Sequence, residues 1–165
     1  MVSPSRRALV DELAAHDRLV EVGVGNRPAV ARALAERGSR VVAVDIDPGE
    51  RTLAAARAAE GEGAEGSLRA RRGDVLALAD AGTGERDAGP LADVDGPVDA
   101  VYACNLPAEL QRPTVALAER LNAACAFTTL GFEEPVVPVR RRSVGGTPLY
   151  VARDAGRGER SSGPE

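Results

Sequence analysis

Lysine and tryptophan are absent from this chain of 165 residues, and aromatic side chains make up only 2% of it. The 21 basic residues are therefore all arginine, and with 25 acidic residues they give a formal net charge of −4 at pH 7. A chain of this charge is not a general polyanion binder, and so few aromatic rings offer little surface for stacking on bases. A nucleic acid partner is supported only by two groups of arginines, Arg69, Arg71 and Arg72, and Arg140, Arg141 and Arg142.

Cysteine, histidine and long apolar runs are also scarce. Cys104 and Cys125 form no CxxC pair and have no nearby histidine, which argues against a zinc site and for a reducing compartment. The single histidine, His16, falls in an expected surface helix, where solvation is its expected role. No apolar run is long enough to span a membrane, and the N-terminal region has no signal-peptide pattern. We therefore expect a cytoplasmic protein with no metal site and no membrane association.

What is present is an alternation of apolar, strand-like runs with helical patterns. Strands are expected at 19–22, 40–47, 68–78, 98–104 and 125–130, the third of them as a weak edge strand. Helices are expected at 5–18, at 28–37, where Gly38 ends the pattern, at 48–60, and at 107–124 with a break at Pro113. Residues 80–97 have the composition of a polar loop, and "PVVPVRRR" and "TPLYVAR" flank "SVGG" as the arms of a hairpin.

This order of elements is typical of an α/β protein. It predicts an open, mostly parallel Rossmann-like sheet with helices on both faces and a C-terminal antiparallel hairpin. The expected organisation is one domain over 1–153 followed by a disordered tail over 154–165, which contains no large apolar side chain. Right-handed crossovers bring every strand-to-helix loop to one edge of such a sheet, where ligands usually bind. The candidate site residues occupy those loops: Gly23, Gly25, Asp45, Asp74 and Asn105.

The stretch "LVEVGVGNRPAVARAL", residues 19–34, carries the most specific signal. Gly23 and Gly25 allow a sharp turn and the close approach of a ligand, and the helix that follows offers unpaired amide groups to an anion. The GxGxxG pattern of dinucleotide sites would place a third glycine where this chain has Pro28. Glu21 separates the cofactor classes further, because a carboxylate is unfavourable beside a pyrophosphate and favourable beside a cationic cofactor.

These motifs resemble those of class I S-adenosylmethionine-dependent methyltransferases. "EVGVGNR" is similar to the family's first signature, with Arg27 in place of the last glycine, and "VVAVDID", "GDV" and "VDAVYACNLP" occupy the next three positions. The resemblance implies an adenosyl cofactor held by the glycine turn with Glu21 and Asn26. It further implies that Asp45 binds the ribose hydroxyls, Ile46 lies against adenine, Asp74 meets the adenine amino group, and Asn105 contacts the substrate or the cofactor.

The chain as a whole resembles something narrower, a short uncharacterised archaeal protein family with a Rossmann-like fold and an "ELQRP" segment, here Glu109–Pro113. That resemblance implies a methyltransferase-like fold without establishing activity. Comparison of "NLPA" with the N-P-P-Y motif of enzymes that methylate base amino groups fails, because Leu106 and Ala108 replace the second residue and the aromatic ring. We therefore do not predict that activity.

Three functions stay open at this point. The first is a small methyltransferase of unknown substrate with unassigned catalytic residues, the second a non-catalytic binding or partner-subunit module of the same fold. The third is an NAD-type dinucleotide-binding protein, which Glu21 and Pro28 disfavour. Structural roles also compete with binding roles: Glu21 pairing with Arg27 or capping the turn, Asp45 capping the strand end while Asp47 caps the next helix, and Asp74 as a plain loop residue.

Overall fold

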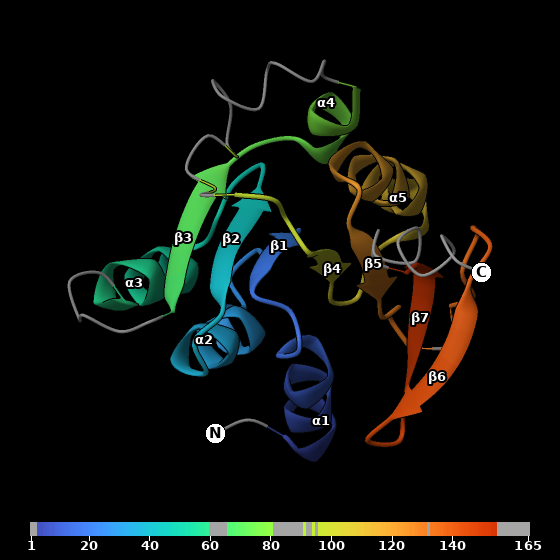
Figure 1. Ribbon diagram of the computed structural model, residues 1–165, viewed down its shortest axis with the longest axis horizontal. Helices are drawn as coiled ribbons and strands as arrows, with labels where there is room; N and C mark the ends of the chain where they lie inside the picture. The colour runs from blue at the N-terminus through green and yellow to red at the C-terminus, as the bar shows by residue number, and fades with distance from the viewer. Residues whose placement is uncertain are drawn as a thin grey trace, which may run out of the picture.

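A single twisted sheet with helices on two sides organises the chain (Figure 1). The computed structural model describes residues 3–59, 66–80, 91, 94, 96–131 and 133–154. Its elements, in chain order, are α1 (Pro4–Leu13), β1 (Arg18–Val22), α2 (Ala29–Glu36), β2 (Arg40–Asp45), α3 (Glu50–Ala59), β3 (Ser67–Arg72), α4 (Val75–Asp80), β4 (Ala100–Ala103), α5 (Ala108–Leu121), β5 (Ala124–Phe127), β6 (Arg140–Val144) and β7 (Thr147–Arg153).

The strands lie in the order β3-β2-β1-β4-β5-β7-β6. The first five pair in parallel, and β7 is antiparallel to both β5 and β6. Gly145 and Gly146 form the two-residue turn of the hairpin with φ of 61° and 81°, values that favour glycine. The mostly parallel sheet, the hairpin and the edge position of β3 are therefore confirmed.

Apolar side chains cover both faces of the sheet, as a two-sided parallel sheet requires. On β1, Val20 and Val22 pack in a core with residues of α4 and α5, whereas Leu19 packs in a second core with residues of α1, α2 and α3. Figure 1 shows the same division, with α1, α2 and α3 on one side of the sheet and α4 and α5 on the other. The prediction of helices on both faces is confirmed.

The segment expected to be one strand over 68–78 is instead a strand and a helix. β3 ends at Arg72, and the carboxylate of Asp74 accepts a hydrogen bond from the backbone N–H of Leu76 at 3.0 Å. The carbonyl of Asp74 accepts from the N–H of Leu78 at 2.9 Å, so Asp74 starts α4 as its cap. The apolar run of α4 faces the core through Val75 and Leu78.

The helices also differ from expectation in several details. α5 continues through Pro113, because the carbonyl left without a donor belongs to the exposed Glu109 in the first turn. α1 ends at Leu13, so His16 lies in the connection to β1. α3 begins at Glu50, two residues later than expected. Most of the expected loop 80–97 and the expected tail beyond Asp154 lie outside the described residues.

The connection from β5 to β6 contains no helix in its described residues, 128–131 and 133–139. It is held on α5 by Gln111, whose fully buried side chain accepts a hydrogen bond from the N–H of Val136 at 2.7 Å. None of the helices in the described ranges is long and apolar enough to cross a membrane.

Candidate functional site

The glycine turn after β1 has the backbone conformation that its sequence predicts. Gly23 and Gly25 have φ of +74° and +56°, in the left-handed region that glycine adopts without strain. The N–H of Gly23 donates to the carbonyl of Val44 at 2.8 Å, which ties the turn to the end of β2. The turn thus lies at the carboxyl ends of two adjacent parallel strands, where this class of sheet binds ligands.

Asp45, the last residue of β2, holds the turn in place. One carboxylate oxygen accepts a hydrogen bond from the N–H of Gly25 at 2.8 Å, and the other accepts from the N–H of Asp47 at 2.9 Å. A carboxylate has about four acceptor positions, so two such bonds leave it free to accept from further donors. Asp45 therefore stabilises the turn and keeps acceptor capacity next to it.

Asn26 contributes to the turn by capping a neighbouring helix. Its side-chain oxygen accepts a hydrogen bond from the N–H of Arg51 at 2.7 Å, in the first turn of α3. The carbonyl of Gly25 accepts from the hydroxyl of Thr52 at 2.7 Å. The expectation that Asp47 caps this helix is wrong: the carboxylate of Asp47 lies 3.3 Å from the guanidinium of Arg72. An amide from a distant loop satisfies the helix instead.

Glu21 is buried in the sheet, with 2% of its surface exposed. The hydroxyl of Tyr102 donates a hydrogen bond to Oε1 of Glu21 at 2.7 Å, and the two residues are register partners on β1 and β4. The structure therefore pairs Glu21 with Tyr102, and the alternative pairing with Arg27 is wrong. Burial raises the pKa of Glu21 to about 7, the Tyr102 hydrogen bond opposes this rise, and the charge of Asp45 adds to it.

A small cavity of about 100 Å³ adjoins the glycine turn. It brings together four of the residues that the sequence predicted, namely Gly23, Asp45, Ile46 and Asp74. Ile46 is 66% exposed, which is unusual for a large aliphatic side chain next to buried strands. Leu110 of α5 also lines this cavity, and no local signal in the sequence connects it to the turn, because the contact depends on how α5 packs.

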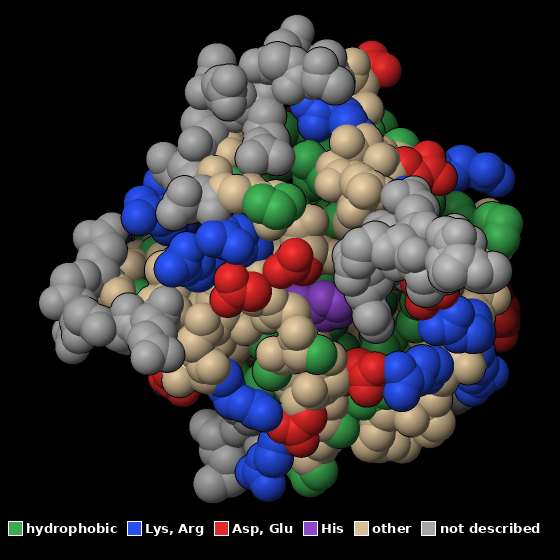
Figure 2. All heavy atoms as spheres, viewed as in Figure 1, with side chains coloured by type: hydrophobic (Ala, Val, Ile, Leu, Met, Phe, Trp, Pro, Cys, Tyr) green, Lys and Arg blue, Asp and Glu red, His purple; other side chains and the backbone are tan. Residues whose placement is uncertain are grey.

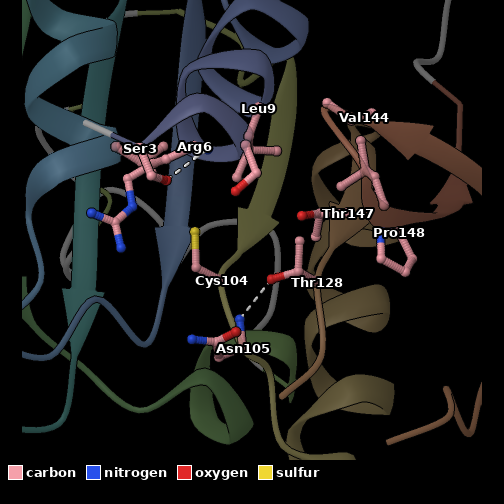
Figure 3. Close-up of a pocket in the computed structure, with 12 residues that line it drawn as sticks. Ser3, Arg6, Leu9, Cys104, Asn105, Thr128, Val144, Thr147 and Pro148 are labelled. Carbon is pink, nitrogen blue, oxygen red and sulfur yellow. Dashed lines mark hydrogen bonds between the residues drawn. The ribbon is translucent and has the colours of Figure 1, made fainter. Parts of the chain in front are cut away.

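A second cavity, of about 150 Å³, lies beyond the end of β4 (Figure 3). Its base is formed by Cys104, Asn105 and Thr128, and its walls come from the start of α1 and from the β6–β7 hairpin. Asn105 has a φ of 57°, and its N–H donates to the hydroxyl oxygen of Thr128 at 2.9 Å. Burial raises the pKa of the Cys104 thiol well above its ordinary value, so the thiol is neutral.

Asn105 thus lines a different cavity from the other predicted site residues. Within the described parts of the chain, no group of three or more His, Cys, Asp or Glu side chains could hold a metal ion. Figure 2 shows arginine and acidic side chains interspersed on the face in view, without a continuous basic surface. Of the arginines expected to contact phosphates, Arg72 donates to the carbonyl of Ile46 at 2.9 Å.

Several solved structures, two of them methyltransferases, are similar in fold to this chain. An RNA methyltransferase from Salinibacter ruber, in complex with S-adenosyl-L-homocysteine, has a TM-score of 0.50 at 23% identity, covering 92% of this chain and 90% of its own. MtNAS in complex with MTA and tNA has a TM-score of 0.57 at 19% identity, covering 90% of this chain. The bifunctional kinase-methyltransferase WbdD has a TM-score of 0.54 at 15% identity, covering 92%.

The chain spans 59% of the length of MtNAS and 38% of that of WbdD. At these identities, the likeness shows a shared α/β Rossmann-like fold, which confirms the predicted fold class.

Relatives at higher identity come from archaea. UPF0146 proteins from two strains of Halobacterium salinarum are 44% identical over 156 residues, covering 94% of this chain and 100% of their own. The model of the family described as "Uncharacterised protein family (UPF0146)" matches residues 5–61 and 88–155. These matches confirm the predicted resemblance to an archaeal family. The chain belongs to the UPF0146 family.

Proposed function

We propose that this protein binds S-adenosylmethionine at the glycine turn and acts as a small methyltransferase. The observation that carries the proposal is the combination of a buried carboxyl group, Glu21, with a glycine turn whose backbone is held by Asp45. Gly23 and Gly25 carry no side chain, so a ligand can approach the backbone closely at these two positions. The similarity of the fold to an RNA methyltransferase solved with S-adenosyl-L-homocysteine supports the same cofactor class.

The first cavity offers groups suited to an adenosine moiety. Asp45 retains acceptor capacity for ribose hydroxyls, and Ile46 presents an exposed apolar surface to which an adenine ring can pack. Asp74 is half-buried in the same cavity, and its carboxylate could accept from the adenine amino group in addition to the N–H of Leu76. In this proposal Asn26 acts indirectly, since its amide oxygen is already used to cap α3.

Glu21 is suited to a cationic ligand. The sulfonium and amino groups of S-adenosylmethionine are positively charged, and a positive charge nearby favours the ionised form of a carboxyl group. When bound, this cofactor supplies an electrophilic methyl group attached to a positively charged sulfur. Methyl transfer can proceed through correct positioning of the acceptor, so a dedicated base is not required. Asn105, at the end of β4, is the candidate contact to the acceptor.

The non-catalytic alternative is favoured by one observation, the small volumes of about 100 and 150 Å³ of the two cavities. Such a protein would bind the same cofactor without transferring the methyl group. Binding and transfer are therefore separate measurements, and each decides a separate part of the proposal.

Calorimetry with S-adenosylmethionine, S-adenosylhomocysteine and NAD tests binding. We expect both adenosyl compounds to bind more tightly than NAD, and Glu21→Gln to weaken S-adenosylmethionine binding by about 1–3 kcal/mol, the range for a hydrogen bond to a charged group. The matched control is Glu36→Gln, because Glu36 is an exposed residue of α2. Tighter binding of NAD than of both adenosyl compounds would contradict the proposal.

Incubation of the protein with cell extract and methyl-labelled S-adenosylmethionine tests transfer. Label that enters an acceptor with the wild-type chain and is lost with Asp45→Ala supports a methyltransferase. Tight cofactor binding with no transfer to any extract fraction would leave the binding module as the function.

A further inference from the structure

We infer that the second cavity binds a small molecule through a carboxylate or phosphate group held by Arg6, and that this molecule is the methyl acceptor. The first part stands on the cavity itself, and the second rests on the proposed function. The cavity shares no lining residue with the cavity at the glycine turn. It begins at the end of β4 and extends toward the hairpin, on the side of β1 away from β2, so it lies where an acceptor would meet a cofactor held over β1 and β2.

The residues that line the cavity carry one positive charge and no negative charge. Arg6 is the one charged residue among those that line it, and no Asp or Glu does so. Two other contacts of α1 show arginines with acidic partners, since Arg37 lies 2.6 Å from Asp11, and Arg142 pairs with Glu12. The guanidinium of Arg6, by contrast, has no hydrogen bond or ion pair with any residue in the described ranges. The chain as a whole has a net charge of −4, but Arg6 gives this cavity a local preference for an anion.

A second arginine adds to the positive electrostatic potential at the cavity. Both Arg6 and Arg27 act electrostatically on the Cys104 thiol at the base of the cavity, opposing the rise that burial causes in its pKa. Arg27 lies in the glycine turn, and among the described residues its guanidinium also has no hydrogen-bond or ion-pair partner. Glu21 acts on the same thiol in the opposite direction, and more strongly than either arginine alone. Its pKa of about 7 leaves it partly protonated near neutral pH, which reduces this negative contribution.

Hydrogen-bond donors surround the same space. The oxygen of the Thr128 hydroxyl accepts from the N–H of Asn105, which leaves the hydroxyl hydrogen free to donate into the cavity. The Asn105 side chain is exposed at the end of β4 and carries two donor hydrogens. Figure 3 shows Arg6 on one side of the cavity and Thr147 on the other, with Asn105 and Thr128 at its base. The positive end of the α1 dipole adds to the preference for an anion.

The volume of the second cavity and its apolar lining residues indicate the class of ligand that it can bind. A volume of about 150 Å³ admits a small molecule rather than a polymer segment. Leu9, Val30 and Leu149 give the cavity an apolar part next to its polar base, which suits a short apolar body attached to an anionic group. We therefore favour a small organic acid or phosphorylated metabolite over the phosphodiester backbone of RNA.

Anion binding can be measured without knowing the natural acceptor. The full chain, saturated with S-adenosylhomocysteine, is titrated with acetate, with inorganic phosphate and with acetamide as the neutral analogue, while backbone amide signals are followed by NMR. We expect acetate or phosphate, and not acetamide, to shift the signals of Ser5, Asn105 and Thr128 in a saturable way. Which of the two anions binds more tightly distinguishes a carboxylate acceptor from a phosphorylated one.

Arg6→Gln should weaken the binding of the preferred anion about tenfold, as expected for the loss of a charge-assisted hydrogen bond. Arg7→Gln is the matched control, since Arg7 is the next residue of the same helix and does not line the cavity. Neither change should affect folding, because both side chains are exposed. S-adenosylhomocysteine affinity should stay within about twofold in both variants.

Several results would overturn the inference. These are a chain that responds to acetamide as it does to acetate, an anion affinity that Arg6→Gln leaves unchanged, and an S-adenosylhomocysteine affinity that falls as much as the anion affinity. The last result would assign Arg6 to the cofactor. Binding of single-stranded RNA that depends on Arg6, without a response to either small anion, would also overturn it. Saturable anion binding in a chain that fails to bind S-adenosylhomocysteine would support the anion site and contradict the proposed function.

Discussion

Replacement of Glu21 by Gln should change how the stability of the protein depends on pH. Burial raises the pKa of Glu21 from 4.5 to about 7 in the folded chain, and the same carboxyl group regains its ordinary pKa when the chain unfolds. Between these values the unfolded chain loses a proton that the folded chain keeps, so unfolding becomes easier as pH rises. The stabilising effect of the neutral carboxyl group is complete below about pH 4.5 and is lost as pH rises through about 7.

The magnitude follows from the size of the pKa change. At about 1.4 kcal/mol for each pH unit, a rise from 4.5 to about 7 corresponds to about 3 kcal/mol of unfolding free energy. Gln cannot ionise, and its side-chain oxygen can accept the hydrogen bond that the Tyr102 hydroxyl donates to Oε1 of Glu21 at 2.7 Å. Glu21→Gln should therefore match the wild type near pH 4.5 and exceed it by about 3 kcal/mol above pH 8.

Urea unfolding of both chains at a series of pH values measures this difference directly. Other titrating groups are common to the two chains and cancel, and Glu36→Gln provides a variant that loses an exposed carboxylate instead. Unfolding free energies that run in parallel from pH 4.5 to 9 would refute the reasoning. A variant less stable than the wild type above pH 8 would also refute it, since Glu21 would then be ionised and stabilised in the folded chain.

Three further changes have defined outcomes. Asp45→Ala should lower the unfolding free energy in urea by about 1–3 kcal/mol, because two backbone N–H groups lose their acceptor, and calorimetry should show weaker S-adenosylhomocysteine binding. Gly66→Ala should lower the unfolding free energy by more than about 2 kcal/mol, because its Cβ would lie 2.1 Å from the carbonyl oxygen of Ala35. Its control, Gly131→Ala, should lower it by about 1 kcal/mol for the positive φ alone, and equal losses of unfolding free energy in urea would contradict this. Truncation after Asp154 should leave the melting temperature unchanged, as the removed residues have no large apolar side chain to bury, and a drop of several degrees would show the opposite.

The strands, and the meeting of their following loops at one edge of the sheet, could be predicted from the sequence because both depend on local patterns. Valine-rich runs predicted β1 and β2, and the handedness of crossovers predicted that Gly23, Asp45 and Asp74 would meet at one edge, where they line one cavity. The isolated carboxylate in an apolar strand marked Glu21 as unusual, and the structure shows it buried, with 2% of its surface exposed. Its use in binding remains a prediction.

Contacts between distant segments could not be predicted from the sequence. The acceptor that caps α3 comes from Asn26, 25 residues before the N–H it satisfies, so the nearer Asp47 was the natural but wrong expectation. Tyr102 carries no motif, and only the register of β1 against β4 brings its hydroxyl to Glu21. α4 did have a local signal, an Asp ahead of a short apolar run. The run "VLALA" suits a strand as well as a helix, and periodicity cannot separate the two at that length.

The second cavity has walls from the two ends of the described chain. α1 stands on one side and the β6–β7 hairpin on the other, joined by the ion pair between Glu12 and Arg142 and by the close packing of Gly145 against Ala8. During synthesis, the glycine turn, Asp45 and Asp74 leave the ribosome well before the hairpin does. The proposed adenosine site can thus assemble on a growing chain, whereas the second cavity cannot form until the last strands have been made and docked beside β5. We therefore expect the first cavity to form before the second one during synthesis.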